Sequence, residues 1–192
     1  FWDEWSKLHA MFERCYAWQE YVQPGAWPDC DMLPLGRIQK TEELEKYRNR
    51  YTRFTHDEQI TMMTLWGIFR SPLMMGGEMR ENDEFTLSLL QNRELIDMLK
   101  NSSGARQFKR EEVDGKGEII WTSKGEKCKY VALFNTDDKE RKISFNVTDI
   151  AVGGAEYIIW DMWAHKEYTV TTDEFSAKVN PHGARLFKIT IK

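Results

Sequence analysis

Residues 55–77 read THDEQITMMTLWGIFRSPLMMGG, and this stretch decides the fold. It opens with a capping box, in which the Thr55 hydroxyl accepts from the backbone N–H of Glu58 and the Glu58 carboxylate reaches back to the N–H of Thr55. A helix is therefore predicted to begin here. Apolar side chains then follow on nearly all sides, which predicts a helix that is buried on most of its faces. The proline at position 72 ends it, and the apolar run at 73–77 predicts a buried parallel strand.

Helices and strands alternate on both sides of this stretch. Apolar residues recur at steps of three and four over 2–22, which predicts a helix that Pro24 and Gly25 end. The other segments predict, in order, a short strand near 28–34, a loop with a helical turn over 37–54, a helix capped by Asn82 or Asp83, and a helix over 94–99. This order is typical of a parallel α/β protein. Two strands cannot close a barrel, so residues 1–103 are expected to be part of a larger domain.

The hydrophobic period changes to two after Gly104. Apolar side chains alternate with polar ones from Phe187 to Lys192, which predicts one buried and one wet face. Residues 104–192 are therefore expected to form an antiparallel β-sandwich of about six to eight strands. The predicted strands lie at 118–121, 130–134, 143–147, 157–160 and 186–191, with turns at 114–115, 137–138, 153–154 and 182–183.

Composition excludes several classes of protein. Aromatic residues make up 13% of the 192 residues and the formal charge is only -4, which argues against intrinsic disorder. A pI of 5.7 argues against nucleic-acid binding, and no apolar run reaches the roughly 18 to 20 residues of a membrane span. The three cysteines form no C-x-x-C pair and have no histidine at metal-ligand spacing, so no metal site is predicted. Because the first residue is Phe1 rather than Met, we expect a fragment of a longer protein.

The densest group of reactive side chains lies in residues 24–33, PGAWPDCDML. In an extended backbone, Asp29 and Asp31 would point to the same side, roughly 6.5 to 7 Å apart. Paired carboxylates at the C-terminal end of a parallel strand can bind hydroxyl groups or act as acid and base. Alternatively, both aspartates cap loops and hold a neighbouring arginine, or they bind a metal ion.

Residues 25–36, GAWPDCDMLPLG, together with the stretch at 57–77, closely resemble glycoside hydrolase family 27, which contains the α-galactosidases and α-N-acetylgalactosaminidases. Looser similarity follows at 92–95, 161–163 and 181–187. The resemblance implies a fold of α/β plus all-β class, in which a (β/α)8 TIM barrel precedes an antiparallel β-sandwich. Residues 1–103 would hold the last helices and strands of the barrel, and residues 104–192 the sandwich. The seventh and eighth barrel strands would lie near 28–34 and 72–77.

The resemblance also implies a mechanism. The family hydrolyses glycosides with retention of configuration through two aspartates, a nucleophile and a general acid/base. Nothing in the chain matches the segment of the nucleophile, and the acid/base is expected immediately before Phe1, so no catalytic residue is assigned within the chain. Asp3 would be the acid in a shifted register. The simpler expectation is that Asp3 accepts backbone donors at a helix N-terminus.

Substrate-binding residues are implied by the same resemblance. Met32 would line the sugar pocket beside the anomeric carbon, with core packing as the alternative. Trp27, Asp29 and Asp31 are expected to shape the pocket floor. Cys30 stands where many members of the family have Pro or Ala, which affects the fine shape of the pocket. Neither a metal nor a cofactor is implied.

Two functional hypotheses remain open. The first is the C-terminal part of a retaining exo-glycosidase that acts on terminal α-linked galactose or a related sugar, such as N-acetylgalactosamine or β-arabinopyranose. The isolated chain would then be inactive and would need a complementary chain or a second copy as its partner. The second is a non-catalytic module, in which the sandwich binds carbohydrate or a partner through exposed Trp121, Trp160 and Trp163. Burial of these tryptophans against the 55–100 helices would argue against it.

Overall fold

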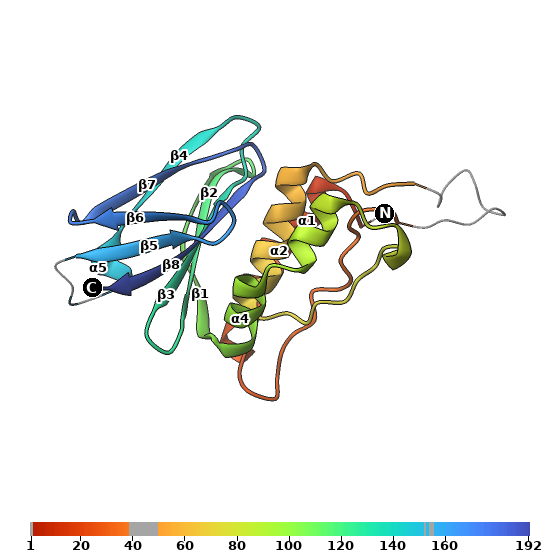
Figure 1. Cartoon of the computed structure of the whole chain (residues 1–192). Helices are drawn as coiled ribbons and strands as arrows, with labels where there is room; N and C mark the ends of the chain where they lie inside the picture. The colour runs from red at the N-terminus through yellow and green to blue at the C-terminus, as the bar shows by residue number, and fades with distance from the viewer. Residues whose placement is uncertain (1, 39–49, 152, 154–155) are drawn as a thin grey trace.

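The computed structural model describes residues 2–38, 50–151, 153 and 156–192. Helices and irregular segments make up its first part, and strands dominate the second. These are named the helical part (residues 2–102) and the sandwich part (residues 103–192). Figure 1 shows them side by side, with α1 and α2 next to the larger sheet.

The helices form as the sequence predicts. The capping box is present, because Thr55 Oγ1 accepts from the Glu58 N–H at 3.2 Å and Glu58 Oε2 accepts from the Thr55 N–H at 2.9 Å. Asp83 caps α3, and Asn92 caps α4. The described helices are α1 (Trp5–Trp18), η1 (Gln19–Tyr21), α2 (His56–Phe69), η2 (Met79–Glu81), α3 (Glu84–Leu90) and α4 (Arg93–Asn101). None of these is long and apolar enough to cross a membrane.

Arg70 joins the end of α2 to the end of α4. It ends α2 in a left-handed conformation with φ 68°. Its guanidinium donates to the carbonyl oxygens of Leu99 and Lys100, both at 2.8 Å, and of Ser102. A cation at this position also complements the partial negative charge at the C-terminus of α4. The contact therefore sets where the chain enters the sandwich part.

The two predicted barrel strands are much shorter than expected. They meet in one parallel bridge, in which Leu33 N–H donates to Met74 O at 2.7 Å and Gly76 N–H donates to Leu33 O at 2.9 Å. The parallel direction agrees with the prediction, but the ladder does not extend. Asp31 is left-handed with φ 79°, and Pro34 has no N–H to donate. Part of the predicted 37–54 loop, residues 39–49, lies outside the described residues.

The sandwich part contains two antiparallel sheets. The larger has the order β1-β2-β3-β8-β5-β6, and the smaller pairs β4 with β7. All five predicted strands are present, whereas β1, β6 and β7 were not predicted. The predicted turn at 153–154 lies partly outside the described residues. The strands are β1 (Ser103–Val113), β2 (Lys116–Lys124), β3 (Lys129–Asn135), β4 (Arg141–Asn146), β5 (Tyr157–Asp161), β6 (Lys166–Val170), β7 (Glu174–Val179) and β8 (Ala184–Ile191), with a short helix, α5 (Val147–Ile150), after β4.

The centre of the larger sheet is buried on both faces. Along β3, Val131 and Leu133 pack toward the smaller sheet, while Ala132 and Phe134 pack toward the helical part. Successive side chains of a strand point to opposite faces, so each face has its own core. On β8, Phe187 and Ile189 are buried as predicted, whereas Ile191 on the same face is 49% exposed. The larger sheet is the middle of three layers.

His182 holds the helical part and the sandwich part together. Its ring stacks on Trp5 with centroids 3.9 Å apart. Nδ1 lies 2.9 Å from Glu58 Oε1 and Nε2 lies 3.1 Å from Asp138 Oδ1. Its backbone oxygen accepts from the Thr61 hydroxyl at 2.6 Å. The turn before β8 is therefore attached to the first turns of both α1 and α2.

The tryptophans considered for a binding face contact the helical part instead. Trp121 is fully buried. Trp160 Nε1 donates to Glu94 Oε2, and Trp163 Nε1 donates to Thr64 Oγ1, both at 2.9 Å. This arrangement argues against the hypothesis of a carbohydrate-binding sandwich that uses these three residues.

Candidate functional site

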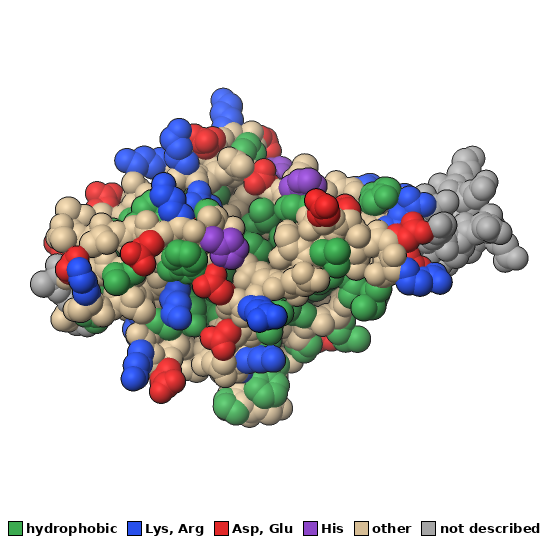
Figure 2. Space-filling view, in the orientation of Figure 1, with side chains coloured by type: hydrophobic (Ala, Val, Ile, Leu, Met, Phe, Trp, Pro, Cys, Tyr) green, Lys and Arg blue, Asp and Glu red, His purple; other side chains and the backbone are tan. Residues whose placement is uncertain are grey.

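A cavity of about 560 Å³ lies in the helical part. Helix α1 forms one wall, α2 another, and the irregular segment 28–34 forms the floor. Hydrophobic side chains reach the surface at several places over the helical part (Figure 2). Most of the lining is apolar, with a few polar groups, which is the usual character of a small-molecule site. The apolar lining consists mainly of Trp2, Leu8, Met11, Cys15, Trp18, Cys30, Met32, Met62, Trp66 and Phe69.

The floor carries both aspartates of the motif in a tight turn. Asp29 Oδ1 accepts from the Asp31 N–H at 2.8 Å, and Asp31 Oδ1 accepts from the Met32 N–H at 2.7 Å. The indole N–H of Trp66 on α2 donates to Asp31 O at 3.0 Å, which fixes the turn from below. With Asp31 at φ 79°, the extended arrangement expected for the two carboxylates is wrong.

The turn leaves Asp29, Asp31 and Met32 available to a ligand. All three border the cavity and are exposed, Met32 by 53%. Core packing of Met32, the alternative considered from sequence, does not occur. Among the described residues, the second oxygen of each carboxylate has no protein donor, so both can accept hydrogen bonds from hydroxyl groups.

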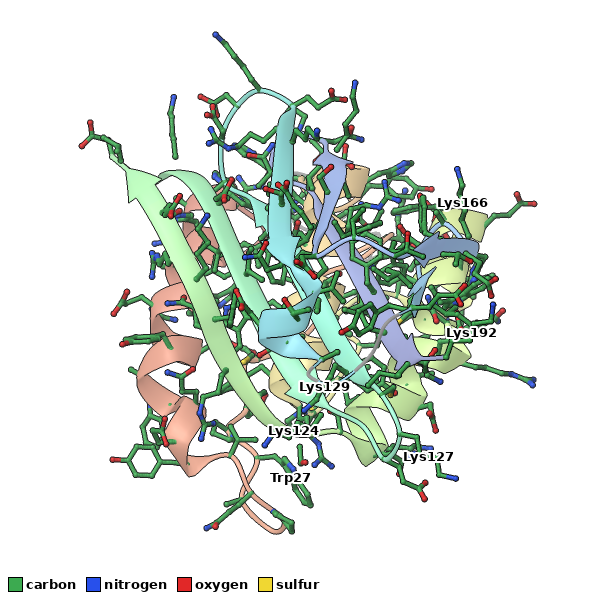
Figure 3. All side chains as sticks on the ribbon, turned by 90° about the vertical axis from the view of Figure 1, so that its left-hand side faces the viewer. Trp27, Lys124, Lys127, Lys129, Lys166 and Lys192 are labelled. Atoms are coloured by element: carbon green, nitrogen blue, oxygen red, sulfur yellow. The ribbon has the colours of Figure 1, made fainter. Side chains whose placement is uncertain are left out.

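Trp27, predicted to shape the pocket floor, is not among the residues that line this cavity. Gly25 is left-handed with φ 86°, and Gln23 and Ala26 exchange backbone hydrogen bonds of 3.0 and 2.8 Å across the turn. This turn sends Trp27 to the edge of the molecule (Figure 3). There the Arg70 guanidinium lies 5.4 Å from its ring centroid. A cation over the face of an indole is an attractive contact, so Trp27 has a structural partner.

Asp3 is buried at the start of α1 and bound by two arginines. It accepts from Arg50 Nη2 at 3.0 Å, from the Arg53 N–H at 2.9 Å and from Arg53 Nη2 at 3.3 Å. Burial alone would raise the pKa of this carboxyl, but the Arg50 and Arg53 hydrogen bonds outweigh it and lower the pKa to about 2. Asp3 is therefore an anion at neutral pH, and it does not line the cavity.

Most of the cavity wall was not predicted from the sequence, including four residues that lie on one face of α1. Lys7, Met11, Arg14 and Trp18 all border the cavity from α1. They follow one another at steps of four, three and four, so they lie on one face of the helix. The apolar steps of three and four over 2–22 predict a helix, but Lys7 and Arg14 are not part of that apolar pattern. This helical spacing is the sequence signal that could have identified these four residues as one face.

The described part of the cavity floor shows no cluster of metal-ligating side chains. Within the described ranges, no group of three or more His, Cys, Asp or Glu side chains is arranged to hold a metal ion. Asp29 and Asp31 instead use one oxygen each on backbone N–H groups. The D-x-D metal alternative therefore has no third ligand among these residue types.

Comparison with known proteins agrees with this architecture. Residues 1–101 match the family model described as alpha galactosidase A, and residues 115–189 match the alpha galactosidase C-terminal beta sandwich domain. The helical part therefore corresponds to the end of a TIM barrel.

Two relatives illustrate the similarity. A GH27 β-L-arabinopyranosidase from Geobacillus stearothermophilus, solved with arabinose, is 43% identical with a TM-score of 0.90, over 100% of this chain and 44% of that one. Alpha-galactosidase 2 from Arabidopsis thaliana is 25% identical over 98% of this chain and 44% of its own length. The chain thus spans less than half of these relatives. It belongs to the melibiase-like glycoside hydrolase family 27 and corresponds to the C-terminal part of its members.

Proposed function

We propose that this chain forms the end of the catalytic barrel, with the attached sandwich, of a retaining exo-acting glycoside hydrolase. The observation that supports the proposal is the cavity floor, where Asp29, Asp31 and Met32 lie together. The segment that carries them belongs to the part of the chain that matches the family. The carboxylates would accept hydrogen bonds from sugar hydroxyls. The exposed Met32 side chain would contact the apolar C–H face of the sugar ring.

The proposed substrate is a glycoside with a terminal α-D-galactopyranosyl or β-L-arabinopyranosyl group. The two rings carry their hydroxyl groups in the same arrangement, and the arabinose lacks only the exocyclic CH2OH. This chain is 43% identical to the β-L-arabinopyranosidase but 25% identical to the plant α-galactosidase. That difference favours the arabinopyranoside as the better substrate.

We place both catalytic carboxylates on polypeptide other than these 192 residues. Retaining hydrolysis needs two carboxyl groups about 5 to 5.5 Å apart, one of them protonated at the start. Asp3 does not suit the acid role, since its ion pairs keep its pKa at about 2. The partner polypeptide would also cover the apolar wall of the cavity, where Trp2 and Trp18 are 60% and 55% exposed.

Complementation tests this proposal. The 192-residue chain is assayed on aryl β-L-arabinopyranoside and aryl α-D-galactopyranoside, alone and after co-folding with the part of the Geobacillus relative that it does not cover. We expect no turnover alone and turnover in the mixture, with the arabinopyranoside preferred. Turnover by the isolated chain that is lost in Asp3→Asn would overturn the placement of the carboxylates.

The role of the cavity floor is tested in the active mixture. Asp31→Asn removes a carboxylate that faces the substrate, so KM should rise at least tenfold. Asp57→Asn is a matched control, because Asp57 is half-buried at the start of α2 and contacts Asn180 rather than the cavity. An unchanged KM in Asp31→Asn would contradict the proposed sugar contact.

A further inference from the structure

Cys15 and Cys30 bring two thiols together at the wall of the cavity. Their Sγ atoms lie 3.7 Å apart, one on α1 and the other on the floor segment between the two aspartates. Both side chains line the cavity, and the two residues are only 1% and 4% exposed. The third thiol, Cys128, lies in the turn between β2 and β3, apart from this pair.

We propose that Cys15 and Cys30 are an oxidisable dithiol, a modification site whose co-substrate is a low-molecular-weight disulfide such as oxidised glutathione. The product is an internal disulfide that fastens the cavity floor to α1. This inference concerns the thiols themselves and does not depend on the identity of the sugar.

The geometry permits bond formation with a small movement. An S–S bond is about 2.05 Å long, so the two sulfurs must approach by about 1.7 Å. Cys30 lies on the segment 28–34, which has one ladder contact with the described residues, the Leu33–Met75 bridge, and the Cys30 N–H donates to Ser71 Oγ at 2.9 Å. The irregular floor can follow the sulfur more easily than α1 can, because a helix is fixed by its backbone ladder.

The chemistry is two successive thiol–disulfide exchanges. One cysteine loses its proton, and its sulfur attacks the oxidised glutathione, which forms a mixed disulfide and releases one glutathione. The second cysteine sulfur then attacks the protein-bound sulfur of that mixed disulfide and releases the other. Two S–H bonds are lost and one S–S bond forms in the protein, while the small disulfide is reduced to two thiols.

Burial sets the rate of this reaction. It raises the pKa of the Cys15 thiol well above its ordinary value, with the neighbouring Cys30 adding to the shift. The attacking species is the thiolate, whose fraction grows about tenfold per pH unit below the pKa. The exchange should therefore be slow at pH 7 and about tenfold faster at pH 8.

The experiment uses the 192-residue chain with oxidised glutathione at pH 7 and pH 8, followed by peptide mapping under non-reducing conditions. We expect a Cys15–Cys30 cross-linked peptide that lacks two hydrogen atoms and reverts on reduction. Cys128→Ala should give the same product at the same rate. Cys15→Ala should give none, and Cys15→Ser serves as a second variant if the alanine chain does not fold.

Three results would overturn the inference. They are a stable mixed disulfide without a cross-link, a cross-link that involves Cys128, and reaction of the pair only in urea. Circular dichroism of each variant establishes that it is folded before oxidation. The cross-linked form should also unfold at a higher urea concentration than the reduced form, since the closed loop restricts the unfolded chain.

Discussion

The sandwich part pairs its backbone and buries its apolar side chains more completely than the helical part does. In the sandwich part, eight strands pair in two sheets and bury a core between them. In the helical part, the pair of barrel strands is reduced to a single bridge. Exposed large apolar side chains follow the same division. Among the described residues, the sandwich part exposes only Phe108, Val113 and Ile191, whereas the helical part exposes ten large apolar side chains, of which Trp2, Trp18 and Met32 border the cavity.

The two parts depend on each other unequally for their stability. The outer face of the larger sheet shares one continuous core with α1, α2 and α4. Trp121 from β2 lies edge-on to Phe69 of α2, with ring centroids 6.0 Å apart. The helical part is therefore stabilised on its sandwich side and has no such cover on its cavity side. We expect the two parts to unfold together.

The largest test of this dependence is Trp121→Ala. The side chain is fully buried in the shared core, so its loss should lower the free energy of unfolding by about 3 to 5 kcal/mol. Urea unfolding followed by circular dichroism and by fluorescence should give one coincident transition, shifted as a whole. Val113→Ala is the control, since Val113 is 77% exposed. Two separate transitions, of which only one moves, would show that the parts are independent.

Asp3→Asn removes contacts that lie within the helical part. Removing a buried carboxylate from Arg50 and Arg53 should lower the free energy of unfolding by about 1 to 3 kcal/mol. Because the folded pKa of about 2 lies below the ordinary 3.8, the wild-type stabilisation is complete above pH 4 or so and is lost as pH falls toward 2. Urea midpoints at pH 6 and pH 3 measure this. The gap between variant and wild type should narrow at pH 3, and an equal gap at both would contradict the assignment.

Trp163→Phe tests the contact between the parts. The substitution keeps an aromatic ring but removes the indole N–H and with it the 2.9 Å hydrogen bond to Thr64 Oγ1. We expect a loss of about 1 kcal/mol in unfolding free energy. A double-mutant cycle with Thr64→Val measures the coupling directly, and additive effects would mean that the contact does not join the parts.

Trp18→Gln should have the smallest effect on stability and a visible effect on association. Trp18 is 55% exposed on the cavity wall, so the free energy of unfolding should change by at most about 0.5 kcal/mol. Self-association of the isolated chain, measured by sedimentation velocity, should weaken because the uncovered apolar wall shrinks. The matched control is Ile191→Gln, which is 49% exposed on the sandwich part. Equal weakening by both variants would remove the distinction between the two surfaces.

The helices could be predicted from the sequence because their signals are local. Thr55 and Glu58 specify one helix start, and Asp83 specifies another, whatever surrounds them. The missed strands lack such a signal. β1 and β6 lie at the two edges of the larger sheet and carry mostly polar side chains, so their pairing comes from neighbouring strands rather than from their own pattern.

Part of the cavity floor could be identified from the sequence, but its conformation could not. The motif drew attention to Asp29, Asp31 and Met32, and all three border the cavity. The left-handed turn at Asp31 depends on Trp66 of α2, whose indole N–H donates to the Asp31 carbonyl oxygen. Trp27 also contacts a distant cation, Arg70, after the local turn at Gly25 has set its direction. The contact that holds the turn at Asp31 joins segments far apart in sequence, so no local pattern encodes it.

The position of β8 in the larger sheet limits how early this sheet can form during synthesis. β8 is the last of the described strands in chain order, yet it lies between β3 and β5 in the larger sheet. Synthesis proceeds from the N-terminus at roughly 5 to 20 residues per second. Until β8 emerges from the ribosome, the β1-β2-β3 meander and the β5-β6 hairpin have no strand to join them. The larger sheet can therefore close only after β8 is synthesised, and a chain truncated before Ala184 would leave the edges of β3 and β5 open.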